Sequence, residues 1–445
     1  MASVAAHAPA AAVPEASAYS RPRTAYITFI LALVFLLAAA DRNMMSILLV
    51  PIQKDLGASD TAMGLLAGAA FSLVYATVAL PLARFADRGH RRNLIAIALA
   101  FWSAMTAICG LAGSYGALLA ARIGVAAGES AHQPAILSMI GDLYSRRRRG
   151  IAVGLVAAGS SIGIALSAYL AGWINDNYSW QAAFFVMGLP GLGVAALVLF
   201  TLPEPARGVF DGGAKPDPAH ASFWRSLRYL AGVPTIPRLL LAKILLQVGF
   251  QGFLVWAPAF FIRVHNMSPT RMGVIFGASV GIGGVAAQLL AGLSSDFLSE
   301  RGERWRSWWC TACLFAGMPF VLMIILGSTN VAIVGMFMIA IVTGGATTAS
   351  ITAGLGVVRG TMRGFMTAAM MFCVSVFGMA LGPVILGAVS DGLKAVHGDL
   401  SIRYALLMVP LAWVLAGAAF WFAGRTADRD AAIAAGEIAA PAAAR

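Results

Sequence analysis

The chain has 445 residues, of which 60% are hydrophobic and 11% are charged, and its formal net charge is +12. Soluble domains carry about 25% charged residues, so one soluble core could not bury this much apolar surface. The apolar residues form continuous blocks of the roughly 20 residues that a helix needs to cross a bilayer. Strands of a membrane barrel would instead alternate with a period of two. The composition therefore predicts an all-α polytopic membrane protein.

The positive charge does not form one basic surface. Only four of the 31 basic residues are lysine, and most of the arginines form short clusters between apolar blocks, in every second loop. Such loops are typical of the cytoplasmic side of a membrane protein, whereas nucleic-acid binding needs a contiguous basic patch or stripe. We therefore expect no nucleic-acid partner.

Residues 1–24 are rich in alanine and proline and contain no apolar run, so we expect a disordered cytoplasmic tail. A cleavable signal peptide is not expected, because the first apolar block is long enough to span a membrane and contains a charged pair. Twelve blocks predict membrane-spanning helices, over 25–50, 61–83, 93–112, 116–140, 150–173, 181–202, 238–262, 270–293, 306–328, 331–356, 364–389 and 403–424.

The loop charges predict how these spans are oriented. Arginines lie in the N-terminal tail, in the loops after the even-numbered spans and in the C-terminal tail. The remaining loops hold only Lys54, Arg263, Arg271, Lys394 and Arg403. Because cytoplasmic loops carry the excess of Lys and Arg, both termini are expected in the cytoplasm. We expect a multi-pass protein of the inner (plasma) membrane.

A polar segment over residues 203–236, interrupted by proline and glycine, predicts a cytoplasmic linker. It separates two blocks of six spans, 25–202 and 237–425, and residues 426–445 follow as a cytoplasmic tail. The division predicts two six-helix bundles.

The two halves repeat short patterns. Asp87 and Asp296 each follow the second span of their half, four residues after a small residue and before arginines. Gly172-x-x-x-Asp176 closes the fifth span as Gly387-x-x-x-Asp391 closes the eleventh. Repeats of this kind predict that a substrate site lies between the bundles, near the membrane midplane.

Two acidic residues, Asp41 and Glu129, lie deep within predicted spans. A charge at the bilayer centre costs at least about 2.5–3.5 kcal/mol on insertion scales, so such residues mark functional sites by default. In the fourth span Arg122 precedes Glu129 by seven residues, which places both on one helix face about 10 Å apart. His132 and Gln133 are expected to continue that polar face.

The seventh span carries the second predicted polar stripe. Lys243, Gln247 and Gln251 recur at steps of four, and Phe250 and Trp256 lie among further aromatic residues of the same span. The amides suit a polar head group and the aromatic rings suit an apolar body. Lys243 is close to one end of its span, so snorkelling of its ammonium group to the membrane surface is the alternative.

Other chemistries find little support in the sequence. Cys109, Cys310, Cys313 and Cys373 all lie inside apolar blocks and are interpreted as small core residues. Because no second cysteine pair or histidine accompanies Cys310 and Cys313, we predict no metal site. The chain lacks the G-x-x-x-x-G-K-[ST] loop that holds nucleotide phosphates, and no nucleophile–base pair occurs in the spans. We therefore expect no enzyme and no cofactor.

Several segments resemble known transporters. Pro81-Leu-Ala-Arg-Phe-Ala-Asp87-Arg88-Gly-His-Arg91-Arg92 resembles the signature loop of the major facilitator superfamily. Ala40-Asp41-Arg42-Asn43 and Arg122-Ile-Gly-Val-Ala-Ala-Gly-Glu129-Ser130 resemble its spinster-like branch. The resemblance implies the twelve-helix major facilitator fold and the transport of sphingolipids, lysophospholipids or related amphiphiles. It also implies a cytoplasmic latch between helices, which we assign to Asp87, Arg88, Arg91 and Asp296.

In that fold the first and fourth helices border a central cavity, so Asp41 is expected near Arg122 or Glu129. Burial raises the pKa of a carboxyl group, whereas a nearby arginine lowers it. We expect Asp41 and Glu129 to be proton-coupling acids, with Arg122 switching between them. The alternative is a static ion network. His132 is either a proton relay or a neutral, hydrogen-bonded histidine.

The sequence thus predicts a proton-coupled secondary transporter of a lipid-like amphiphile, of the lysophospholipid or sphingoid type, acting as a monomer among membrane lipids. The residues expected to bind substrate are Arg42, Gln133, Lys243, Gln247, Gln251, Phe250 and Trp256. Two other transport functions stay open: a proton symporter of small organic anions, and a proton-driven multidrug exporter. A receptor or scaffold would explain neither the paired bundles nor the intramembrane acids.

Overall fold

The computed structural model describes residues 19–207, 223–299 and 301–437. Within these ranges the regular structure is helical throughout and contains no strand. The first half makes six passes, formed by α1 (Arg21–Leu56), α2 (Asp60–Gly64) with a π-helical turn (Leu65–Ala69) and α3 (Ala70–Arg88), α4 (Arg91–Cys109), α5 (Tyr115–Glu129) with α6 (His132–Leu143), α7 (Arg146–Asn177) and α8 (Trp180–Thr201).

The second half repeats this arrangement after a short helix, α9 (Phe223–Gly232). Its six passes are formed by α10 (Thr235–Val264), α11 (Pro269–Ser299), α12 (Glu303–Leu326), α13 (Thr329–Gly356), α14 (Arg363–Phe372) with a π-helical stretch (Cys373–Met379) and α15 (Ala380–His397), and, after α16 (Ser401–Ala405), α17 (Met408–Ala435). Short 3-10 turns over Gly360–Met362 and Gly398–Leu400 precede α14 and α16.

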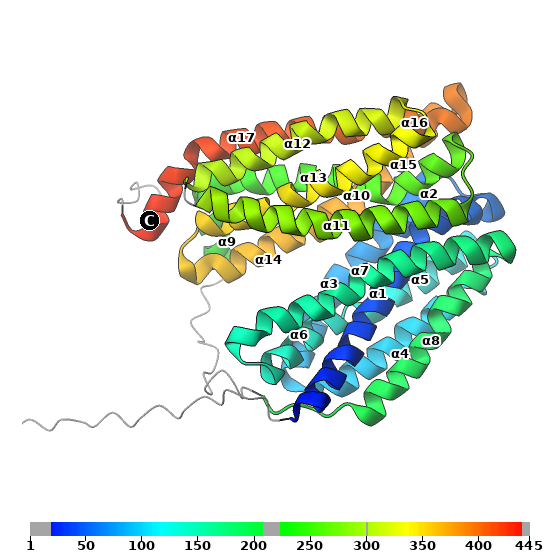
Figure 1. Cartoon of the computed structure of the whole chain (residues 1–445), viewed down its shortest axis with the longest axis horizontal. Helices are drawn as coiled ribbons and strands as arrows, with labels where there is room; N and C mark the ends of the chain where they lie inside the picture. The colour runs from blue at the N-terminus through cyan, green and yellow to red at the C-terminus, as the bar shows by residue number, and fades with distance from the viewer. Residues whose placement is uncertain (1–18, 208–222, 300, 438–445) are drawn as a thin grey trace, which may run out of the picture.

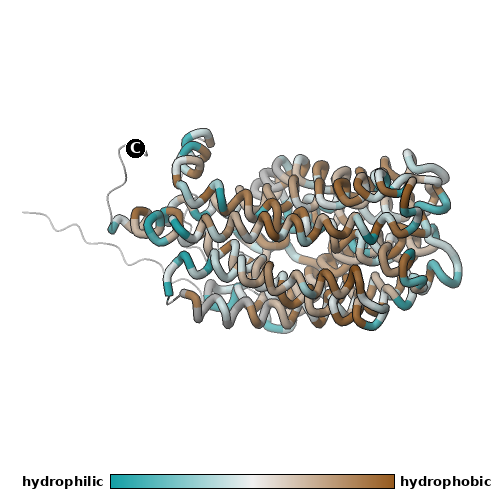
Figure 2. Tube along the Cα trace, turned by 90° about the horizontal axis from the view of Figure 1, so that it is seen from above, coloured by the Kyte–Doolittle hydropathy of each residue, from teal (hydrophilic) through white to brown (hydrophobic). Residues whose placement is uncertain are grey.

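The described helices include ten segments long and apolar enough to cross a membrane. One of these, Gly360–Ala435, contains two passes. The pair α5–α6 makes a further pass although neither helix reaches the length of a span by itself. The expectation of twelve membrane-spanning helices is therefore confirmed. Hydrophobic residues dominate the middle of the molecule, and hydrophilic residues lie toward its two ends (Figure 2).

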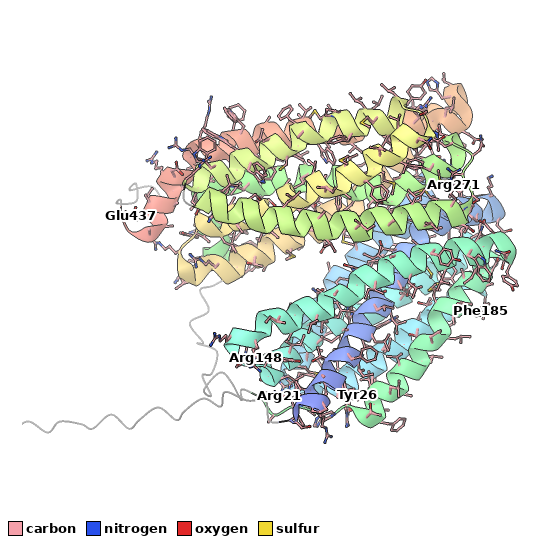
Figure 3. All side chains as sticks on the ribbon, viewed as in Figure 1. Arg21, Tyr26, Arg148, Phe185, Arg271 and Glu437 are labelled. Atoms are coloured by element: carbon pink, nitrogen blue, oxygen red, sulfur yellow. The ribbon has the colours of Figure 1, made fainter. Side chains whose placement is uncertain are left out.

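The two six-helix bundles lie close together at one end and spread apart toward the other (Figure 1). The closed end carries α2 and α16, and the open end carries the start of α1, α9 and the end of α17. Arg21 and Arg148 lie at the open end, whereas Phe185 and Arg271 lie at the closed end (Figure 3). The described ends of the chain are therefore on the same side of the molecule.

Close backbone contacts join the bundles. A Cβ atom added to Gly273 of α11 would lie 2.1 Å from the carbonyl oxygen of Ala168 of α7, and one added to Gly64 would lie 2.4 Å from that of Pro383 of α15. No side chain fits at such distances, so glycine is required where these helices meet. The contacts pair α7 with α11 and α2 with α15, which is the two-fold pattern that the internal repeats predict.

The fourth span differs from the expected continuous helix. It breaks at Ser130 and Ala131, between α5 and α6. Pro134 explains the break, because its ring lacks an N–H group and would collide with the carbonyl of Ser130 in an unbroken helix.

Three boundaries also differ from the expected ones. The helix α1 begins at Arg21, inside the expected tail 1–24, and α9 lies inside the expected linker 203–236. The helix α17 continues to Ala435, ten residues beyond the expected bundle end. Residues 426–435 contain five alanines, the residue with the strongest intrinsic helix preference, and Asp430 accepts a hydrogen bond from the backbone N–H of Thr235, at 3.0 Å. Residues 1–18 and 438–445 of the expected tails lie outside the described ranges.

Candidate functional site

Asp41 on α1 and Arg122 on α5 form a buried ion pair. Arg122 Nη1 lies 3.0 Å from Asp41 Oδ1, and Thr106 Oγ1 on α4 donates a hydrogen bond to Asp41 Oδ2. Asp41 keeps 4% of its surface exposed and Arg122 keeps 1%. Removing one partner of such a pair would leave an uncompensated buried charge. The structure therefore brings together two of the expected site residues and joins three helices through them.

Glu129, the last residue of α5, pairs with a different arginine. Arg42 Nη2 lies 2.8 Å from Glu129 Oε2. The Glu129 side chain is fully buried, whereas 33% of the Arg42 side chain is exposed. Glu129 Oε1 is buried and has no hydrogen-bond partner among the described residues. In this conformation each acid thus has its own arginine, and Arg122 is not shared between them.

Aromatic rings of α3 lie close to the guanidinium groups of both arginines. The ring of Phe71 lies 5.3 Å from the guanidinium carbon of Arg122 and 5.4 Å from that of Arg42. The ring of Tyr75 lies 5.3 Å from the same carbon of Arg42. Cations within about 6 Å of a ring centroid are attracted by the negative face of the ring. Because Phe71 and Tyr75 are four residues apart, they lie on one face of α3.

His132 begins α6 at the break in the fourth span. Its Nδ1 lies 2.5 Å from the backbone oxygen of Glu129, and its ring packs against Phe35 and Trp102, at 5.2 and 5.5 Å between centroids. The polar face was expected to continue through both His132 and Gln133, but the two residues have different surroundings. His132 is buried, whereas Gln133 is exposed and accepts a long hydrogen bond from Tyr75, at 3.4 Å.

Lys243 lies inside the second bundle. Its side chain is fully buried, and Nζ donates to Ser350 Oγ at 2.8 Å and to the carbonyl oxygen of Thr347 at 3.2 Å, both on α13. The ammonium group does not reach the membrane surface, so the snorkelling alternative is wrong. Nor does Lys243 present any exposed surface to a substrate in this conformation.

The other expected residues of α10 fall into two groups. Phe250 and Gln251 are partly exposed. Gln247 keeps 5% of its surface and Trp256 none, and the indole N–H of Trp256 donates to the carbonyl oxygen of Pro383, at 2.8 Å. In this conformation Trp256 therefore fastens α10 to α15, and only Phe250 and Gln251 of this stripe offer substantial surface to a ligand.

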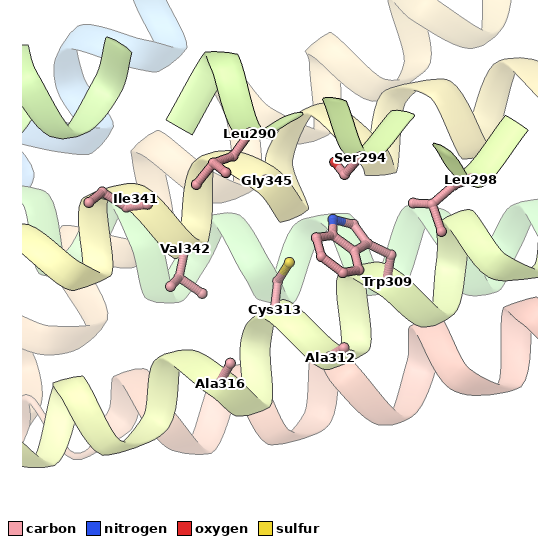
Figure 4. Close-up of a pocket in the computed structure, with 10 residues that line it drawn as sticks. All are labelled: Leu290, Ser294, Leu298, Trp309, Ala312, Cys313, Ala316, Ile341, Val342 and Gly345. Carbon is pink, nitrogen blue, oxygen red and sulfur yellow. The ribbon is translucent and has the colours of Figure 1, made fainter. Parts of the chain in front are cut away.

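The second bundle also contains an apolar cavity of about 500 Å³ between α11, α12 and α13. Ligand sites are typically clefts of about 300–1,000 Å³. Figure 4 shows the lining side chains, with Ser294 and the indole of Trp309 among small and aliphatic residues. The lining residues are Leu290, Ser294, Leu298, Trp309, Ala312, Cys313, Ala316, Ile341, Val342 and Gly345. The sequence gives no signal for this cavity, because small residues such as Ala312 and Gly345 resemble ordinary helix-packing residues.

Arg91 is placed at the open end of α4 and lies within one bundle. Its Nε lies 2.8 Å from Glu204 Oε1, its Nη1 pairs with Asp142 of α6, and its Nη2 donates to the carbonyl oxygen of Pro205, at 2.7 Å. Arg91 therefore ties α4 and α6 to the segment after α8. The side chains of the other residues assigned to the latch, Asp87, Arg88 and Asp296, lie outside the described part of the structure.

No group of three or more His, Cys, Asp or Glu side chains that could hold a metal occurs among the described residues. The four cysteines are buried and unpaired, as small core residues would be.

Known proteins resemble this chain over most of its length. A bacterial homologue of the lysosomal transporter Spinster, solved in an inward-facing and unoccupied conformation, superposes with a TM-score of 0.83 at 26% identity, covering 93% of this chain and 99% of that one. An MFS-type efflux pump of Mycolicibacterium smegmatis is 29% identical, covering 92% of this chain and 95% of the pump. The sphingosine-1-phosphate transporter SPNS2 of Danio rerio is 25% identical, covering 85% and 80%. The sequence model of the Major Facilitator Superfamily matches residues 31–383, so this chain belongs to the Major Facilitator Superfamily and is one of its Spinster-like transporters.

Proposed function

We propose that this chain is a proton-coupled transporter of a lipid-like amphiphile, with Asp41 and Glu129 as the coupling acids. The observation that carries the proposal is the pair of adjacent acid–arginine contacts in the middle of the first bundle, Arg122 to Asp41 at 3.0 Å and Arg42 to Glu129 at 2.8 Å. Buried ion pairs are costly and can often be replaced by apolar packing. Their presence here supports a role in the transport cycle.

The proton acts through the arginine that each acid holds. Protonation of Glu129 removes the counter-charge of Arg42, and the partly exposed guanidinium then becomes available to an anionic head group. Binding of that head group and deprotonation of Glu129 therefore compete for one arginine. This version replaces the expected switching of Arg122 between the two acids with two separate pairs, each of which opens on its own.

The apolar body of the substrate has space in the second bundle. The cavity of about 500 Å³ is lined mainly by aliphatic and small residues, and burying a methylene group is worth about 0.8 kcal/mol. The name of the SPNS2 relative specifies sphingosine-1-phosphate, which has an anionic head and one long alkyl chain. A substrate of this class has a head group suited to the arginine and a chain suited to the cavity.

The open end of the molecule corresponds to the cytoplasm in this proposal. The arginine-rich loops and both described ends of the chain lie there, in agreement with the excess of positive charge in cytoplasmic loops. The conformation is then inward-facing.

A pH gradient imposed on liposomes that contain the purified protein tests the coupling. We expect Asp41→Asn and Glu129→Gln to lose uptake driven by the gradient, while exchange of labelled for unlabelled substrate continues. Gradient-driven uptake that persists in both variants would contradict the proposed role of these acids in proton coupling. Lys243→Met is the matched control, because it removes a buried charge from the other bundle.

A multidrug exporter is the second candidate, favoured by the similarity to the mycobacterial efflux pump. A thermal-shift screen with lysophospholipids, sphingoid phosphates, small organic anions and cationic drugs separates the candidates. Stabilisation by cationic drugs alone would replace the lipid proposal with the exporter, and stabilisation by small anions alone would replace it with the anion symporter.

A further inference from the structure

At the closed end, one aspartate of each bundle binds the first turn of a helix in the other bundle. Asp391 of α15 accepts hydrogen bonds from the backbone N–H groups of Asp60 and Thr61, at 2.9 and 2.7 Å, and from Thr61 Oγ1 at 2.6 Å. Asp176 of α7 accepts from the backbone N–H and the Oγ1 of Thr270 in α11, at 2.9 and 2.5 Å. The first N–H groups of a helix have no partner within it, so both carboxylates satisfy donors that would otherwise need water.

A glycine one helical turn before each aspartate makes the contact possible. A Cβ atom added to Gly387 would lie 2.5 Å from the carbonyl oxygen of Asp60, and one added to Gly172 would lie 2.3 Å from that of Pro269. Residues four apart lie on the same face of a helix. The repeated Gly-x-x-x-Asp therefore brings two helices into backbone contact and places a carboxylate at the helix end that it meets.

These bonds exist only while the closed end is closed, since every one joins the two bundles. Transport by alternating access requires the bundles to separate there in the opposite conformation. The carboxylates gain from the positive end of the helix dipole as well as from hydrogen bonds. Water would take over the same donors after separation, so the contacts can be broken without leaving a buried group unsatisfied.

The two contacts differ in strength. Asp391 holds two backbone N–H groups, whereas Asp176 holds one, because Pro269 occupies the position that corresponds to Asp60 and has no N–H. Asp60 adds its own buried carboxylate, which binds Arg263 of α10 through two hydrogen bonds, at 3.0 and 2.8 Å, and accepts from Ser390 Oγ at 2.6 Å. Nothing comparable surrounds Thr270 among the described residues.

We propose that Asp176 and Asp391 are paired inter-bundle latches that set the balance between the two conformations, and that the Asp391 latch is the stronger. The proposal rests on the membership of a family that works by alternating access and on the contacts above. It is independent of the substrate and of proton coupling, so it stands or falls separately from the proposed function.

Distances between spin labels test the latches in the full-length protein. Leu111 lies just after α4 in the first bundle, and Leu326 is the last residue of α12 in the second. Both lie at the closed end, and each is 73% exposed. Cysteine substitutions there can be labelled selectively, because the four native cysteines are buried. In the otherwise unchanged protein we expect mainly the short distance of the closed end.

We expect Asp391→Asn to raise the ratio of long to short distances by about tenfold or more, as loss of charge-assisted bonds would, and Asp176→Asn to raise it less, by about threefold. Asp55→Asn is the matched control. Asp55 also lies at the closed end, but it accepts from Trp180 Nε1 and Gln181 Nε2 of its own bundle, so the distances should not change.

Two results would overturn the proposal: distance distributions that stay unchanged in both variants, or a shift that Asp55→Asn reproduces. If Asp391→Asn does not fold, Thr61→Val and Thr270→Val remove one donor from each latch while keeping side-chain shape. Unchanged distances in both of these variants would also overturn the proposal, and an effect of Asp176→Asn as large as that of Asp391→Asn would contradict the ranking of the latches.

Discussion

The interiors of the two bundles contain different kinds of side chain, although the bundles share a fold. The first bundle holds Asp41 and Glu129 in ion pairs with Arg122 and Arg42, and the ring of Phe71 lies against both guanidinium groups. The second bundle buries one ammonium group, on Lys243, which meets only a hydroxyl and a carbonyl oxygen among the described residues. It also carries a partly open apolar cavity. The acid–arginine pairs therefore lie in the first bundle and the apolar cavity lies in the second.

This difference shows how a duplicated fold can divide a transport task. An acid–arginine pair can open and close with a proton, because one partner can be neutralised. A small-residue cavity can accept chains of different length, because its walls impose no hydrogen-bond geometry. An amphiphile has a part suited to each bundle, so its transport would couple the two through one ligand.

Breaking the charged interior should have the largest effect. Arg122→Met leaves Asp41 buried without its partner, so we expect the free energy of unfolding in mixed micelles to fall by about 3–5 kcal/mol. The double variant Asp41→Asn with Arg122→Met removes both charges and should recover most of that loss. A single variant as stable as the unchanged protein would show that Asp41 is neutral in this conformation, or that water replaces Arg122.

A substitution of Arg42 tests whether one of these charged side chains binds the ligand. Since its guanidinium is partly exposed and paired with Glu129, Arg42→Gln should weaken the binding of an anionic amphiphile by about tenfold, the loss of about one charge-assisted hydrogen bond. Binding of an amphiphile with a neutral head and the same chain should change little. The two dissociation constants, measured by titration calorimetry, check the prediction, and equal losses for both ligands would contradict it.

Filling the cavity should have a smaller and more selective effect. Ala316→Phe places a ring in the space between α11 and α12, so longer chains should no longer bind more tightly than shorter ones. In the unchanged protein each added methylene should contribute up to about 0.8 kcal/mol. Affinities for a series of chain lengths measure this increment, and Phe315→Leu is the control, because Phe315 is on α12 but does not line the cavity. An unchanged increment in Ala316→Phe would place the chain elsewhere.

The sequence carried enough information for the fold and for part of the site. Span-length apolar blocks and loop charge predicted twelve passes, because lipid tolerates few unpaired polar groups. The cost of burying Asp41 and Glu129 made them candidate site residues. The partners were harder to predict. Asp41 and Arg42 are adjacent, yet they pair with residues seven positions apart on α5. Only the position of α1 relative to α5 in the folded bundle decides which arginine meets which acid.

The remaining failures have a similar cause. His132 and Gln133 were expected to continue the face of Glu129, but the break that Pro134 introduces changes the direction of both residues relative to α5. The effect of the proline could have been considered from the sequence. The burial of Lys243 could not have been predicted in this way. Its stripe with Gln247 and Gln251 shows which face of α10 is polar but not which neighbouring helix that face meets. Phe71, Tyr75 and Thr106 are common residues of membrane helices, so only the acids and arginines around them reveal their role.

Lys243 therefore gives the smallest expected effect and the sharpest test of the division between bundles. If charge exchange belongs to the first bundle, Lys243→Met replaces a buried ammonium group by an apolar side chain of similar length and should leave the free energy of unfolding unchanged or raise it by about 1 kcal/mol. Gradient-driven transport should persist. Loss of gradient-driven transport in a stable Lys243→Met variant would instead show that the second bundle takes part in the handling of charge, because the change leaves the pairs around Asp41 and Glu129 intact.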